Sequence, residues 1–524
     1  MPLIKDKKLT VWDYLLMLAL VAITGGLLFF TLSHGHDWGD DFSVYIAEGI
    51  SLSQGTFVEQ TVRNGEIVNS SSPVVYVWGF PLLLAIVHKL VGFDIVNYSS
   101  LIYYKIPVAV SLMAWSIVLY LFMRKRFGQL ISFTVSLFLT ANPTLLRLAN
   151  SILTDLPFAT LVWISMYLLY AFLYQDFHQH SSQKIVFGVM LGVVIYLANI
   201  TRYVGFTLLI VLGIVQAFEG IHNSIQKRKY RISVNHETIP YTQVFASILP
   251  YLVFFALYFF IGLFMPYAKT QAEDVGTVTM STIINNINSY HSAVGMLMRS
   301  ITPPFKYQSQ LFNTMLFITL LGMVTAARKE LPALIYLVGT LWVVLLLPYF
   351  QGIRYIINIV PCMLLFFFHG ISFLEKWLSC IKSKIFAHTL RIAKYMLLVL
   401  TCFLVIRYGG KAAYTNMRNN RTYDNGAYSQ DAIDMYHYIQ QALLPEDIIA
   451  FTKARALSLN TNRMGKMISR RVEDIPLQAN YLLLSSDPAI KFQYDAHAIL
   501  RKTNRVLEEI YANHTMTLYQ IHQE

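Results

Sequence analysis

Two adjacent carboxylates, Asp40 and Asp41, follow the first long apolar run of the chain, residues 11–32. That run is long enough to cross a bilayer as a helix, so the two acids stand close to a membrane surface. Acids in such a place are costly unless water, a partner or a substrate satisfies them. One interpretation is a base that takes the proton from an attacking hydroxyl or amine. The other is that both acids solvate a loop or cap a helix starting near Phe42, because Asp is a favoured N-cap.

A third acid and four cations occupy similar boundary positions. Asp155 begins another apolar run, where it can also act as an N-cap with Pro157 in the first helical turn. Guanidinium groups bind phosphate oxygens in a bidentate fork and can stabilise a departing phosphate. The alternative for the cations is snorkelling to headgroups, which is the favoured interpretation for the two lysines. The cations are Lys105, Arg202, Lys269 and Arg354.

The sequence predicts no cofactor. His34, His36 and Asp37 do not have the spacing of a strong metal-ligand motif, and headgroup-level histidines are the simpler interpretation. No Gly-rich phosphate loop precedes a helix, which argues against a soluble nucleotide donor. The requirement for a divalent metal is left open.

The composition is that of a polytopic membrane protein. Of 524 residues, 55% are hydrophobic and only 13% are charged. The net charge of +12 comes from basic residues that cluster in alternate loops, the positive-inside pattern. A nucleic-acid partner would instead need a continuous basic face on a soluble domain. The three cysteines lie in or near apolar runs, so no disulfide framework is expected.

Eleven apolar runs are predicted to cross the membrane as helices. With a cytoplasmic N-terminus, the basic loops fall inside and residues 33–97, 266–310 and 408–524 fall outside. Residues 74–91 are also apolar, and we expect them to form a helix at the outer interface. The first run is interpreted as a retained anchor, because no small-residue cleavage pattern follows it. The predicted spans are 11–32, 98–123, 129–146, 156–175, 185–200, 203–218, 243–265, 311–326, 331–349, 354–374 and 395–407.

Two domains are therefore predicted: a membrane domain over residues 1–407 and a small extracytoplasmic α/β domain over 408–524. From about Tyr408 the apolar runs shorten and polar, turn-forming residues increase. A domain of roughly 100 residues is large enough for its own core. Within it the patterns predict a helix from Ser429 to Leu444, strands at 448–451, 481–484 and 515–521, and a helix at 506–511.

These segments together resemble the GT-C glycosyltransferases, polytopic enzymes that use polyprenyl-phosphate sugars. The bacterial branch akin to protein O-mannosyltransferases and lipid A aminoarabinose transferase is the most similar. Residues 41–48 are similar to the family's first outer loop, in which an Asp precedes a Tyr by four positions, here Tyr45. Residues 72–76 are similar to its His-Pro-Pro-Leu-Tyr segment, with Ser72 and Val74 in place of the His and the second Pro.

This spacing puts Asp41 in the place of the family's catalytic Asp. Asp40 is the alternative candidate for the same role. Phe42 stands where the family has a second acid. The resemblance continues through residues 154–158 and 201–205 and through Arg354 and Tyr355. It therefore covers nearly the whole chain with short motifs.

The resemblance implies a GT-C-like fold and a multi-pass glycosyltransferase of the plasma (inner) membrane. The enzyme would move a sugar from a polyprenyl phosphate to a hydroxyl or amine of a glycan, lipid or protein at the outer face. Asp41 would act as base and Asp155 would support the acceptor. Arg202 and Arg354 would hold the lipid phosphate. Further substrate contacts are expected from Tyr45, Lys105 and Lys269.

Two other functions share these features: a transporter or flippase of a lipid-linked substrate, and a catalytically silent relative that binds lipid. Transporters often bind their substrates near the bilayer midplane on broken helices. The candidate residues here gather at one membrane face instead, which favours an enzyme.

Overall fold

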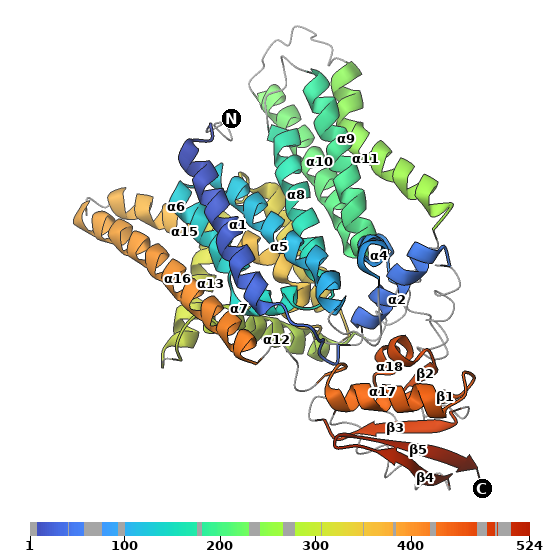
Figure 1. The fold of residues 1–524 in the computed structure, drawn as a ribbon. Helices are drawn as coiled ribbons and strands as arrows, with labels where there is room; N and C mark the ends of the chain where they lie inside the picture. Colours follow the sequence, from blue (N-terminus) through green and yellow to red (C-terminus); the bar gives the residue numbers. More distant parts are fainter. Residues whose placement is uncertain are drawn as a thin grey trace.

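The structure is a computed structural model, in which most of the described residues are helical and a sheet forms near the C-terminus (Figure 1). It describes residues 8–39, 41–56, 76–92, 100–174, 181–229, 241–265, 278–304, 306–348, 350–380, 384–419, 426–468, 479–487, 490 and 505–523.

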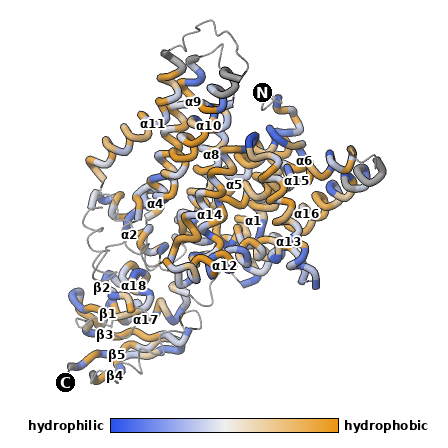
Figure 2. Tube along the Cα trace, turned by 180° about the vertical axis from the view of Figure 1, so that it is seen from behind, coloured by the Kyte–Doolittle hydropathy of each residue, from blue (hydrophilic) through white to orange (hydrophobic). Residues whose placement is uncertain are grey.

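The membrane domain is a bundle of long apolar helices. Nine helices in the described part of the chain are long and apolar enough to cross a membrane. Apolar residues line them along most of their lengths (Figure 2). They are α1 (Val11–Thr31), α5 (Leu101–Arg124), α8 (Asp155–Tyr174), α9 (Ser181–Thr201), α10 (Thr207–Lys229), α11 (Tyr241–Gly262), α13 (Gln308–Ala326), α15 (Val360–Cys380) and α16 (Lys384–Arg418).

The other two predicted spans are also helical, but neither is a straight crossing. The span predicted at 129–146 is two helices, α6 (Gln129–Thr140) and α7 (Pro143–Ala149), bent by 56°. α14 (Leu331–Leu345) has 15 residues, which reach about 22 Å of a hydrocarbon core about 30 Å thick. The polytopic fold is thus confirmed. Nine or ten described spans replace the predicted eleven, depending on whether the bent pair is one span.

The break between α6 and α7 follows from two residues. Pro143 has no N–H to continue α6 and is suited to the first position of a new helix. Asn142 caps that new helix, because its Oδ1 accepts a hydrogen bond from the Thr144 N–H at 2.9 Å. The redirected chain leads to the loop that ends at Asp155, the first residue of α8.

Short helices cover one end of the bundle. α2 (Asp41–Gln54) packs against α4 (Gly79–Val91), and a Cβ on Gly49 would come within 2.9 Å of Leu84, so the contact needs glycine. α4 has 13 residues, too few for a crossing, as predicted for 74–91, although Val74 and Val75 lie outside the described residues. α12 (Met280–Arg299) is longer, with 20 residues, and lies near the same end of the bundle (Figure 1).

The C-terminal domain is a five-stranded mixed sheet with two helices. The strand order is β2-β1-β3-β5-β4; β1 runs parallel to β2 and β3, and β5 runs antiparallel to β3 and β4. The chain reaches it through α16, which runs past residue 407 and ends at Arg418. The elements are α17 (Gln430–Ala442), β1 (Ile448–Phe451), α18 (Ala454–Thr461), β2 (Met464–Met467), β3 (Tyr481–Ser485), β4 (Arg505–Ala512) and β5 (Met516–Gln523).

The predicted helix at 506–511 is wrong, because these residues form β4. The Leu-Glu-Glu run has helical propensity, but pairing with β5 in a hairpin overrides it. The Asn513 Oδ1 fixes the turn by accepting hydrogen bonds from the N–H groups of Thr515 and Met516. The predicted helix after Ser429 and the strands at 448–451, 481–484 and 515–521 are confirmed.

The C-terminal domain contacts the membrane domain through α18, which packs against α2 (Figure 1). The Trp38 indole N–H, in the loop after α1, donates a 2.7 Å hydrogen bond to Asp487 of this domain. We call the end of the bundle that meets the C-terminal domain its domain-facing end.

The opposite end of the bundle is fixed by buried charges. Arg126, just after α5, donates to Glu330 at 2.9 Å, and His369 lies 3.2 Å from the other oxygen of that carboxylate. Both partners of the Arg126–Glu330 ion pair are 1% exposed. The rings of Phe122 and Tyr170 lie 3.7 and 4.2 Å from the guanidinium.

Candidate active site

Asp41 is the first residue of α2 and is held by three other elements. Its Oδ2 accepts a 2.8 Å hydrogen bond from Arg354, and its Oδ1 accepts a 2.6 Å hydrogen bond from the Tyr76 hydroxyl. Arg455 of α18 places its Nη1 3.5 Å from Oδ1 and donates to the Tyr76 oxygen at 3.2 Å. The Asp41 side chain is still 25% exposed, so a substrate can approach it.

These contacts keep Asp41 ionised. Burial alone would raise the pKa of its carboxyl, but the Arg354 charge, the Tyr76 hydrogen bond and Arg455 hold that pKa below its usual value. Burial and the Asp41 charge raise the pKa of Tyr76 well above its usual value, so this phenol stays protonated. Burial alone would lower the pKa of Arg354, but Asp155 and Asp41 raise it. Asp41 is therefore an anion in a cationic surrounding.

Asp155 forms a second ion pair beside the first. It begins α8, is 3% exposed, and accepts a hydrogen bond from Arg202, whose side chain is 18% exposed. The Arg202 guanidinium lies 4.4 Å from the centre of the Tyr355 ring, and the Arg354 guanidinium lies 5.5 Å from the same centre. The two pairs thus share one aromatic side chain and form a single cluster.

Tyr45 lies on α2 one turn beyond Asp41 and is 5% exposed. Its hydroxyl is 3.5 Å from Thr154 Oγ1, next to Asp155, and its ring is centred 4.6 Å from the Tyr76 ring. Burial and the Asp41 charge raise the pKa of Tyr45 as well. Tyr45 therefore packs between the segments that carry the two acids.

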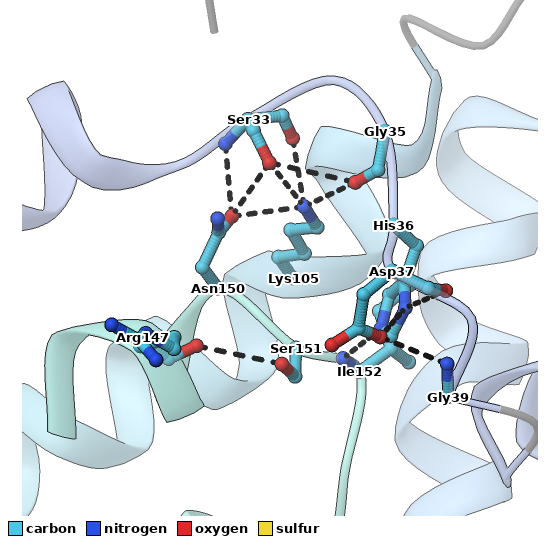
Figure 3. A network of polar contacts seen from close by, with 10 residues as sticks. All are labelled: Ser33, Gly35, His36, Asp37, Gly39, Lys105, Arg147, Asn150, Ser151 and Ile152. Atoms are coloured by element: carbon cyan, nitrogen blue, oxygen red, sulfur yellow. Dashed lines mark hydrogen bonds and ion pairs between the residues drawn. The ribbon is translucent and has the colours of Figure 1, made fainter. Parts of the chain in front are cut away.

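Lys105 lies apart from this cluster, in the buried network of Figure 3. Its Nζ donates to the carbonyls of Ser33 and Gly35 at 2.8 and 2.7 Å, to Ser33 Oγ at 3.0 Å and to Asn150 Oδ1 at 2.9 Å. The side chain is 0% exposed, so it does not reach toward headgroups. Lys105 instead joins the loop that leads to Asp41 with the loop that leads to Asp155.

His36 makes a second link between these loops (Figure 3). Its Nε2 accepts a 3.1 Å hydrogen bond from the Ile152 N–H, and its Nδ1 lies 2.9 Å from Asp37 Oδ1. Burial would raise the pKa of Asp37, but its contact with His36 lowers that pKa to about 2. Within the described ranges, no group of three His, Cys, Asp or Glu is placed to hold a metal ion.

The structure thus brings together four of the residues predicted from sequence, Asp41, Asp155, Arg202 and Arg354, with Tyr45 packed among them. Asp40 and Lys269 lie outside the described residues.

Two residues of the cluster were missed in the sequence. Tyr76 belongs to the segment 72–76 but was given no role. Arg455 stands in the first turn of α18, where the helix dipole disfavours a cation. An arginine in the first turn of a helix is unfavourable unless an anion pairs with it, so this position is the one sequence signal for a partner of Arg455. The signal can be recognised only if the helix α18 has been predicted.

The fold, but not the sequence, matches known proteins. The chain matches no protein-family model and no curated protein. Among solved structures it is similar to ArnT from Cupriavidus metallidurans bound to undecaprenyl phosphate, with 12% identity, 96% of this chain and 97% of that chain covered, and a TM-score of 0.57.

It is also similar to the archaeal oligosaccharyltransferase AglB from Archaeoglobus fulgidus in complex with an inhibitory peptide and a dolichol-phosphate. Identity is 11%, coverage is 93% of this chain and 71% of that chain, and the TM-score is 0.57. The Archaeoglobus fulgidus oligosaccharyltransferase tethered to an acceptor peptide is similar with 11% identity, 95% and 69% coverage and a TM-score of 0.51. The polytopic helical fold with a small C-terminal α/β domain, as predicted from the sequence, is shared with these structures.

Proposed function

We propose that this protein is an integral-membrane glycosyltransferase that moves a sugar from a polyprenyl-phosphate donor to an acceptor hydroxyl or amine. The domain-facing end of the bundle would lie at the outer face of the plasma membrane, with the N-terminus cytoplasmic. The acceptor would be a glycan, a lipid or a protein. Two proteins of this fold have structures with undecaprenyl phosphate or dolichol-phosphate bound, which supports a lipid phosphate as ligand here.

The charge of the cluster is the observation that carries the proposal. Three guanidinium groups, of Arg202, Arg354 and Arg455, face two carboxylates, of Asp41 and Asp155, which leaves one net positive charge. The phosphodiester that joins a sugar to a polyprenol carries one negative charge. Arg354 also has a buried Nε with no hydrogen-bond partner among the described residues, so it retains a donor for that phosphate.

The chemistry needs a proton acceptor and a stabilised leaving group. The acceptor oxygen or nitrogen forms a bond to the anomeric carbon, and the bond from that carbon to the phosphate oxygen breaks. The electron pair of the broken bond stays on the phosphate, where guanidinium groups stabilise the charge. Asp41 takes the proton of the acceptor. Asp155, held by Arg202, orients the acceptor side of the site.

The test is transfer by the full chain purified in detergent, with a panel of lipid-linked sugars and candidate acceptors. We expect transfer by the wild type and a loss of about 100-fold or more in Asp41→Asn, the usual contribution of a general base. Asp434→Asn, which changes an exposed carboxylate of α17, is the matched control and should retain most activity.

Full activity in Asp41→Asn would rule out the base assignment. Translocation of a lipid-linked substrate across vesicle membranes, without chemical change, would show that the protein is a transporter and not an enzyme.

A further inference from the structure

Arg455 brings the C-terminal domain into the candidate site. Its side chain is 8% exposed and its guanidinium lies 5.8 Å from the centre of the Tyr76 ring. The same Nη1 faces both the Tyr76 hydroxyl and the Asp41 carboxylate. The site is therefore incomplete without a residue from a domain outside the membrane bundle.

The contact of Arg455 with Asp41 is the longest of the three that hold this carboxylate. Arg354 and Tyr76 lie within hydrogen-bond distance of the carboxylate, at 2.8 and 2.6 Å, whereas Arg455 is at 3.5 Å. An ion pair at that distance lacks the directional hydrogen bond that makes charged pairs strong. If a second anion enters the site, it can attract the Arg455 guanidinium away from Asp41 more easily than it can attract Arg354 or Tyr76.

We infer that Arg455 is a donor-binding residue that couples donor binding to the basicity of Asp41. In the empty site Arg455 helps to hold the carboxylate; when the donor phosphate binds, the guanidinium turns to the phosphate and Asp41 becomes a better proton acceptor. This inference rests on the proposed function for its activity measurements, but its binding measurement does not.

The charges around Asp41 determine whether donor binding raises or lowers its proton affinity. The groups that face it are Arg354, Tyr76 and Arg455, with Tyr45 on the same helix and the Asp155–Arg202 pair beyond. A nearby cation lowers the proton affinity of a carboxylate, and an added phosphate raises it. Both the departure of Arg455 and the arrival of phosphate therefore make Asp41 more basic in the complex.

The first experiment compares two pH profiles, since kcat/KM reports groups of the free enzyme and kcat those of the complex. In the wild type we expect the acidic limb of kcat to lie at higher pH than the acidic limb of kcat/KM. In Arg455→Gln the acidic limb of kcat/KM should shift to higher pH by about one unit. The pH difference between the acidic limbs of kcat and kcat/KM, which we call the gap, therefore becomes smaller. Arg455→Lys, which keeps the charge, should restore much of the gap.

Lys453→Gln is the matched control, because it removes a cation two positions away whose ammonium group has no hydrogen bond or ion pair with the described residues. It should leave both limbs unchanged. A purely structural role for Arg455 predicts lower activity with unmoved limbs, and an unchanged gap in Arg455→Gln overturns the inference.

The second experiment measures binding of polyprenyl phosphate to the purified full-length variants. Arg455→Gln should weaken binding about tenfold, the usual effect of losing a charged hydrogen bond, and Lys453→Gln should not. Equal affinities in wild type and Arg455→Gln overturn the inference even if transfer is observed. A wild type that binds the lipid but transfers nothing defeats the proposed function instead, and the binding comparison still decides the role of Arg455.

Discussion

Asn150 Oδ1 accepts one hydrogen bond from the Ser33 N–H and another from Lys105 Nζ, each at 2.9 Å. This single oxygen joins the loop before Asp41, the helix α5 and the loop before Asp155. The relative placement of the two acids thus depends on a polar contact that touches neither of them.

Lys105→Met should therefore destabilise the protein and reduce transfer together. The substitution keeps the apolar stem but leaves the carbonyls of Ser33 and Gly35 without the buried ammonium donor. Each buried acceptor that loses its partner costs about 1–3 kcal/mol. The apparent melting temperature in detergent should fall clearly below that of Lys329→Met, an exposed lysine at the opposite end of the bundle. Equal melting temperatures would show that the network is not needed for stability.

Arg202→Gln should be more harmful to stability than the loss of the whole Asp155–Arg202 pair. Removing the cation leaves Asp155 buried and unpaired, which costs about 3–5 kcal/mol. Adding Asp155→Asn removes this unpaired buried charge, so the double variant should regain much of the lost stability. It should remain inactive. Thermal unfolding of the wild type, both single variants and the double variant gives the coupling. Additive effects would mean that the two groups do not interact.

Arg354→Lys should impair donor binding more than it impairs folding. Lysine keeps the charge next to Asp41 but cannot present the planar fork that matches a phosphate. We expect the KM for the lipid-linked donor to rise about tenfold, with a smaller change in the melting temperature. The KM for the acceptor serves as the internal control, and an equal rise in both values would contradict a phosphate-specific role.

The stability of the bundle should fall at low pH through Glu330. Burial would raise the pKa of this carboxyl, but Arg126 and His369 lower it from 4.5 to about 2. A carboxyl with a lowered pKa contributes stability above its unfolded value, and that contribution is lost as the pH falls from about 4.5 toward 2.

The melting temperature of the wild type should thus decrease as the pH falls from about 4.5 toward 2. Glu330→Gln should start lower at neutral pH and show a flatter profile. Parallel profiles for the two proteins would assign the acid sensitivity to other groups.

Sequence reasoning found the membrane helices because hydropathy acts locally. It grouped Asp41, Asp155, Arg202 and Arg354 because alternate loops of a polytopic chain lie at the same membrane face. It did not assign Arg455, since that contact depends on how a separate domain docks against α2. It placed Lys105 near headgroups because a lone lysine at a helix end has no local sign of the carbonyls that surround it. It mistook β4 for a helix because strand pairing is decided by a partner elsewhere in the chain.

Arg455 follows its hydrogen-bond partner Tyr76 by 379 residues. During synthesis, α2 emerges from the ribosome long before α18, so the Arg455 contact with Asp41 forms after the membrane helices are made. A nascent or prematurely terminated chain that lacks residue 455 has two cations facing two carboxylates and no net charge to attract an anionic lipid. The cluster therefore gains its third guanidinium only from a residue that is synthesised after all the described membrane helices.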